Sequence, residues 1–173
     1  RGEAATVRVG YLFSAAQSVL TPALARLRVS HPALKLILHD MSPREQIDGL
    51  QAGELDVALI GQEGLVAAKE FHSLKLCSIG VCAAVAISDP LAGRPQLALK
   101  ELKGRDFVGV DEDQMPGRNQ WMTTLCRTAG FKPRFAVVVD GITNVLSRVV
   151  SELGVTLLPS YFMESSHPGV SFV

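Results

Sequence analysis

The stretch SPREQIDGLQAGELDVALIG, residues 42–61, decides the fold class of this chain. Its first residues meet two rules for a helix start. Ser42 can cap the helix while Glu45 bonds back to the cap, and Pro43 stands at the first helical position, where no N–H is needed. Gly53 supplies the left-handed residue that ends such a helix. The sequence therefore predicts a short capped helix between Ser42 and Gly53.

Two apolar runs flank this helix, Leu34–His39 before it and Leu55–Ile60 after it. Short runs of this kind are typical of strands that are buried on both faces of a parallel sheet. Strand, helix and strand together predict a right-handed βαβ unit. Ligands in such sheets collect at the carboxyl ends of the strands, so we expect function near Ser42 and near Ile60–Gly61.

Composition excludes several classes of protein. The 173 residues carry 17 Lys+Arg and 17 Asp+Glu, so the net charge is zero, and no segment forms a basic stripe that could hold DNA by itself. The sequence contains no run of about 18 apolar residues, which is the length that a membrane-spanning helix needs. Because the chain begins at Arg1 and ends at Val173 in what resembles the middle of a strand, we expect a fragment of a longer protein.

The three cysteines are Cys77, Cys82 and Cys126, an odd number without CxxC spacing. This favours a reducing compartment, and we expect a cytoplasmic protein. Cys77 and Cys82 lie in an apolar run and are interpreted as small buried hydrophobes. A redox-sensing pair that includes Cys126 is the alternative.

The rest of the chain repeats the α/β pattern after an extended crossing at residues 77–87. Strands are predicted at residues 6–12, 106–110, 135–139 and 155–159, and helices at 118–129 and 142–153. A further helix is predicted to begin either at Thr21 or nearer Ser14 with a kink at Pro22. The predicted fold is α/β, with two Rossmann-like lobes joined by crossing strands. Residues 1–78 and 162–173 are assigned to lobe I and residues 79–161 to lobe II, with a ligand cleft between the lobes.

No catalytic, metal or cofactor motif appears in the sequence. There is no GxSxG, HExxH or P-loop, and the four histidines have no ligand-like spacing. Asp56 in the second apolar run could act as a general base. The favoured interpretation is structural, with backbone N–H groups holding its carboxylate at the start of the strand. We expect a binding protein that is not an enzyme.

Five segments resemble, in order, the effector-binding (regulatory) domain of LysR-type transcriptional regulators. Three of them are similar to the family patterns YPDVEL, HPLA and GLGVALLP, and the strongest is LQAGELDVALIG. The segments are Val7–Gly10 followed by Leu20–Leu24, His31–Leu36, Leu50–Gly61, Asp89–Ala92 and Glu152–Pro159. The resemblance covers essentially the whole chain.

This resemblance implies two lobes of the type 2 periplasmic-binding-protein kind, with a small-molecule inducer in the cleft. It also implies an N-terminal winged helix-turn-helix that binds DNA and a final C-terminal helix, both absent from this chain. The family forms homodimers or homotetramers, whose geometry the inducer changes. By resemblance, the helix at residues 21–30 and the strand at 34–39 are candidates for the dimer face.

The resemblance also implies which turns line the inducer pocket. They are Ser14, Ala15, Ala16, Ser42, Pro43, Ile60, Gly61, Val81, Cys82, Pro116, Gly117 and Arg118. Arg118 is the candidate for a bidentate bond to a carboxylate, which suggests an organic or aromatic acid as inducer. The alternative for Arg118 is a residue of the first helical turn that faces solvent.

Two other classes of protein share such a cleft. A periplasmic solute-binding protein would have the same fold but would carry a signal peptide and larger lobes. A small α/β transferase would need catalytic groups that this sequence does not show.

Overall fold

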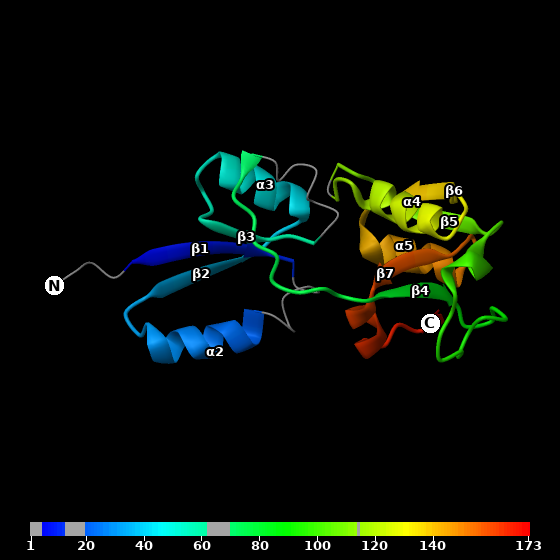
Figure 1. Cartoon of the computed structure of the whole chain (residues 1–173), viewed down its shortest axis with the longest axis horizontal. Helices are drawn as coiled ribbons and strands as arrows, with labels where there is room; N and C mark the ends of the chain where they lie inside the picture. The colour runs from blue at the N-terminus through cyan, green and yellow to red at the C-terminus, as the bar shows by residue number, and fades with distance from the viewer. Residues whose placement is uncertain (1–4, 13–19, 62–69, 114) are drawn as a thin grey trace. The chain divides into compact units, whose positions relative to one another are not determined.

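The computed structural model describes residues 5–12, 20–61, 70–113 and 115–173 (Figure 1). Residues 14–16, which the sequence places in the inducer pocket, lie outside the described residues. The chain divides into two compact units, Arg1–His72 and Ser73–Val173. None of the described helices is both long and apolar enough to cross a membrane.

The first unit is built on a parallel sheet in which β1 is the middle strand. Val9 of β1 pairs with Leu38 on one side and with Val57 on the other. Figure 1 shows helices α2 and α3 on opposite sides of these strands. The elements of the unit are β1 (Thr6–Tyr11), α2 (Leu20–Ser30), β2 (Lys35–Asp40), α3 (Pro43–Gln51) and β3 (Val57–Leu59).

The start of α3 confirms the predicted capping box. The Glu45 N–H donates to Ser42 Oγ at 3.3 Å, and the Ser42 N–H donates to Glu45 Oε2 at 2.7 Å. Pro43 occupies the first helical position. After the helix, Gly53 adopts φ +69°, the left-handed conformation that the sequence predicted.

The prediction that both apolar runs are buried on two faces is wrong. Leu38 is 38% exposed and Val57 is 42% exposed, whereas Val9 is 7% exposed. The reason is topological, because in a sheet ordered β2-β1-β3 both runs form outer strands and only β1 has a neighbour on each side. Helix α2 also buries none of its residues in this unit.

The second unit is a mixed sheet around β4. Strand β4 pairs antiparallel with β7 and with β8, β5 pairs parallel with β6, and a bridge from Phe107 to Val155 joins the two sets. Its elements are β4 (Val81–Ala86), η2 (Leu99–Leu102), β5 (Asp106–Val110), α4 (Arg118–Thr128), β6 (Arg134–Val139), α5 (Gly141–Val150), β7 (Thr156–Pro159), η3 (Ser160–Glu164) and β8 (Val170–Phe172).

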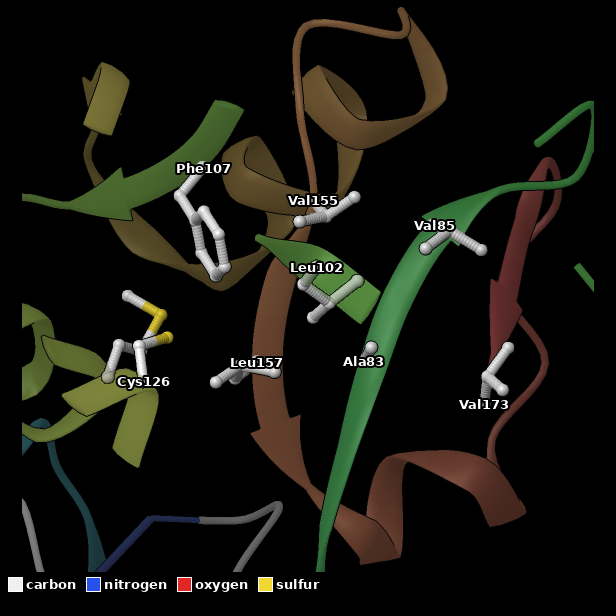
Figure 2. Close-up of a cluster of buried hydrophobic side chains, with 9 residues drawn as sticks. Ala83, Val85, Leu102, Phe107, Cys126, Val155, Leu157 and Val173 are labelled. Carbon is white, nitrogen blue, oxygen red and sulfur yellow. The ribbon is translucent and has the colours of Figure 1, made fainter. Parts of the chain in front are cut away.

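A cluster of apolar side chains forms the main core of this unit. Phe107, Leu102 and Val85 are fully buried, and Cys126 and Leu157 pack with them. Figure 2 shows that the side chains of this cluster come from several different elements. The core therefore joins segments that lie up to 90 residues apart in the chain, from Ala83 to Val173.

The division between the units differs from the one expected from the sequence. The boundary follows His72, and residues 162–173, which were assigned to lobe I, lie in the second unit. The physical reason is the pairing of β8 with β4, after which the Val173 N–H and carbonyl each bond to Ala83 at 2.9 Å. The pattern of residues 169–173 predicted a strand but not its neighbour.

Helix α5 ends earlier than predicted. It stops at Val150, and Glu152 takes a left-handed conformation with φ +60°, so the helix does not run on to Gly154. Gly154 has φ +149° and lies against β5, where an added Cβ would stand 2.7 Å from the Asp106 carbonyl oxygen. Only glycine fits this approach without displacing backbone.

We expect Gly154→Ala to lower the free energy of unfolding by about 3 kcal/mol, because it adds backbone strain and a clash with β5. Gly53→Ala is the matched control, since Gly53 also has positive φ but an added Cβ would meet nothing within 4 Å. It should cost only about 1 kcal/mol. Urea unfolding of the two variants measures the difference, and equal losses would contradict the close approach.

Candidate functional site

The predicted turns of the first unit lie at one edge of its sheet. Ser42 and Pro43 follow β2, and Ile60 and Gly61 follow β3; both strands run parallel to β1. The Met41 N–H donates to the carbonyl oxygen of Tyr11, the last residue of β1, at 2.8 Å. The carboxyl ends of all three strands are therefore close together, as predicted for a ligand-binding edge.

The carboxylate of Glu45 lies at the positively charged N-terminal end of α3. The backbone N–H of Ser42 bonds to Glu45, and this hydrogen bond lowers the pKa of the Glu45 carboxyl. The negative charge that a helix N-terminus favours is already supplied here. The turn at Ser42 and Pro43 thus offers little to an additional anion.

The predicted residues of the second unit also gather at one edge. Val81 pairs with Pro159, the last residue of β7, and the Cys82 thiol points to the Pro159 carbonyl oxygen at 3.6 Å. Residues 116–118 follow β5, which runs parallel to the segment before β7. The start of β4 and the ends of β5 and β7 meet at this edge.

Arg118 is deeply buried within the second unit. It is 2% exposed, its guanidinium donates to the Leu157 carbonyl oxygen, and its carbon Cζ lies 4.5 Å from the centre of the Trp121 ring. The interpretation of Arg118 as a solvent-facing residue is therefore wrong. Its role as a carboxylate partner stays a prediction.

The start of α4 at Arg118 was predicted, but the hydrogen bonds around its N-terminus were not. Gly117 precedes the helix with φ +79°, and Glu112 Oε1 accepts the Asn119 N–H at 2.7 Å. The Asn119 side chain in turn bonds to both backbone groups of Val110. Glu112 lies seven residues before Asn119, outside the three-residue spacing of a capping box, so no local pattern marked it.

Asp56 forms an ion pair that fixes its protonation state. Its Oδ2 accepts the Arg8 backbone N–H at 2.8 Å and the Arg8 Nε–H at 3.0 Å, while Oδ1 accepts Nη2 at 2.8 Å. These bonds from Arg8 lower the pKa of Asp56 to about 2. A carboxylate with so low a pKa is a weak base, which supports the structural interpretation; the Arg8 side chain was not foreseen.

The cysteines differ from one another in exposure. Burial raises the pKa of the Cys82 and Cys126 thiols to about 11, so both behave as small apolar groups. Cys77 is exposed, and its interpretation as a buried hydrophobe is wrong. The described residues contain no cluster of three His, Cys, Asp or Glu side chains that could hold a metal ion.

Comparison with known proteins identifies relatives of the whole segment. The family model described as LysR substrate binding domain matches residues 1–172. The chain is 29% identical over 163 residues to the uncharacterized HTH-type transcriptional regulator YnfL of Escherichia coli, covering 94% of this chain and 54% of that protein. The chain thus spans about half the length of this relative.

Solved structures show the same fold. The Corynebacterium glutamicum OxyR C206 mutant matches with a TM-score of 0.76 at 24% identity, covering 99% of this chain and 54% of that one. The BenM effector binding domain with its effector benzoate matches with a TM-score of 0.72 at 18% identity, covering 99% and 78%. The fold is the type 2 periplasmic-binding-protein-like α/β fold that the sequence predicted.

The Arg8–Asp56 pair predicts a specific loss of stability in acid. Because the folded-state pKa of Asp56 is depressed, from 3.8 to about 2, its contribution is present above pH 4 and disappears as the pH falls to about 2. We expect Asp56→Asn to be less stable than the wild type at pH 7, with the difference shrinking as the pH falls from 4 through about 2. Urea unfolding between these pH values measures the difference.

Asp48→Asn, on the exposed side of α3, is the control and should follow the wild-type profile. A constant difference between Asp56→Asn and wild type from pH 7 to pH 2 would contradict the role of the Asp56 charge.

Proposed function

Because the chain belongs to the family of LysR substrate-binding domains, we propose that it is the effector-sensing part of a longer DNA-binding transcriptional regulator. The match of the family model to residues 1–172 is the observation that carries this proposal. The name of the relative YnfL as an HTH-type regulator supports a helix-turn-helix in the remainder of the protein. Such a regulator acts on DNA in the cytoplasm and performs no catalysis.

The proposed effector is a small organic acid. Arg118 supports this choice, because a buried guanidinium at the edge where β5 and β7 end can hold a carboxylate through two hydrogen bonds. The similar BenM domain binds benzoate, which makes aromatic acids the first class to examine. A solute-binding protein of the same fold is less favoured, since the relatives are transcriptional regulators.

The proposed mechanism is a shift between conformations of the regulator. An effector changes the balance of two states only by its difference in affinity for them. We propose that the state favoured by the effector has a different oligomer geometry and therefore binds DNA differently.

The surface of the first unit supports self-association through α2 and β2. Val29 on α2 is 84% exposed and Leu38 on β2 is 38% exposed. A cavity of about 230 Å³ lies between these two elements, lined by Leu24, Leu27, Arg28, His31, Pro32, Leu34 and Leu36. Exposed apolar side chains on a helix and on the neighbouring outer strand are suited to contact a second copy of the chain.

The first test of the effector proposal is a thermal-shift screen with benzoate, other aromatic acids, aliphatic acids, amino acids and sugars. An acid present at 100 times its Kd should stabilise the wild type by about 2.7 kcal/mol. Arg118→Met should reduce this stabilisation to about half if Kd rises tenfold. Fluorescence of Trp121, the single tryptophan, gives a second readout because its ring stacks on Arg118.

Arg127→Met, an exposed arginine of the same helix, is the matched control and should respond like the wild type. An acid that stabilises Arg118→Met as much as the wild type would remove Arg118 from the site. Failure of the whole panel would count against an acid effector.

The association surface has its own test. We expect Val29→Asp to convert a dimer into a monomer in analytical ultracentrifugation, because a charge on the contact face must be desolvated. Ile87→Asp, at an exposed apolar residue of the second unit, is the control and should leave the dimer intact. A dimer that survives Val29→Asp would place the interface elsewhere.

A further inference from the structure

Gln46 is a fully buried polar residue at the carboxyl edge of the first sheet. It lies in the first turn of α3 and is 0% exposed. Its Nε2 donates to the Met41 carbonyl oxygen at 3.0 Å. Because a carbonyl oxygen can only accept, this bond fixes which end of the amide is the nitrogen.

The other end of the Gln46 amide has no hydrogen-bond partner among the residues that the structure describes. Its Oε1 is buried, and no described residue donates a hydrogen bond to it. Buried polar atoms in folded proteins are almost always paired, so such an acceptor requires an explanation. The carboxamide lies beside the turn at Met41 and Ser42, which belongs to the ligand edge of this unit.

Gly10 shows how closely the side chain is held. A Cβ on Gly10 would stand 3.0 Å from Gln46 Cγ and 2.6 Å from Leu55 Cδ1. Gln46 therefore packs directly against the backbone of β1 at Gly10, which has no side chain. Its amide is held between Gly10 and Met41. An acceptor held this firmly is preorganised for a donor.

Charge at the same turn excludes an anion as the missing partner. The Glu45 carboxylate already bonds to the Ser42 N–H at the start of α3, and the pKa of Glu45 is lowered accordingly. The amide oxygen of Gln46 also carries a partial negative charge. Both groups favour a ligand group that donates hydrogen bonds.

We propose that Gln46 determines specificity in the first unit by accepting a hydrogen bond from a hydroxyl, amide or amino group of the effector. This inference rests on the proposed effector-sensing function and adds a hydrogen-bond donor to the groups expected on the effector. Oε1 is shielded from water. A ligand that reaches it without a donor therefore leaves Oε1 without a hydrogen bond, and this lowers the affinity. Since Gln46 is 0% exposed, the proposal requires the turn at Met41 and Ser42 to open when the effector binds.

The test compares matched ligands that differ in one donor. Calorimetry measures the Kd of each of the three hydroxybenzoates against the corresponding methoxybenzoate. For at least one pair, the wild type should prefer the hydroxyl compound about tenfold or more. Gln46→Met should abolish this preference while leaving the Kd of the methoxy compound nearly unchanged.

Gln51→Met is the control, because it makes the same replacement at an exposed position of α3. It should keep the wild-type preference. If Gln46→Met weakens both members of a pair equally, or preserves the preference, Gln46 has only a structural role and the inference is overturned.

A crystal structure of the ligand-free protein at high resolution decides the question when no probe binds. The inference expects Gln46 Oε1 to face no donor of the protein chain, and a chain donor within hydrogen-bonding distance would overturn it. Absence of binding by every acid would count against the proposed function itself, separately from this result.

Discussion

Strand β4 is the constraint on which the second unit depends. Residues 82–86 are all buried, and the strand pairs with β7 on one side and β8 on the other. Every backbone N–H and carbonyl of a buried strand needs a partner, so both neighbours must be in place for β4 to be buried. The same ladder brings Val81 beside Pro159 and so assembles the edge at which Arg118 lies.

The two helices that begin at the predicted ligand edges share an electrostatic arrangement. Glu45 accepts a backbone N–H at the N-terminus of α3, and Glu112 accepts one at the N-terminus of α4. Each carboxylate satisfies backbone N–H groups that would otherwise attract an anion. The proposed carboxylate effector would then gain its binding energy from side chains and not from these two helix N-termini.

Local patterns in the sequence predicted most of the elements. The capping box of Ser42 and Glu45, the end of α2 before Pro32, and the strands around Val108 and Val137 depend on neighbours within a few residues. The pattern could not reveal that β2 and β3 are outer strands, since strand order is set by contacts between distant segments. Helix α5 ended early because Glu152 adopts the left-handed conformation expected of a glycine.

Among the candidate site residues, the sequence determined which turns follow which strands. Ser42, Pro43, Ile60 and Gly61 lie at the carboxyl ends of parallel strands because the βαβ unit allows no other placement. The sequence did not predict the burial of Arg118, the bond from Glu112 to Asn119 or the buried Gln46 oxygen to which no described residue donates.

Sequence alone therefore determined the family, the order of elements and the ends of strands, because periodicity and capping act over a few residues. Tertiary structure alone decided which side chains are buried and how they are paired. Those properties depend on groups 7 residues apart, as for Glu112 and Asn119, or 48 apart, as for Arg8 and Asp56. No local pattern encodes such distances, and only the folded backbone brings the partners within hydrogen-bonding range.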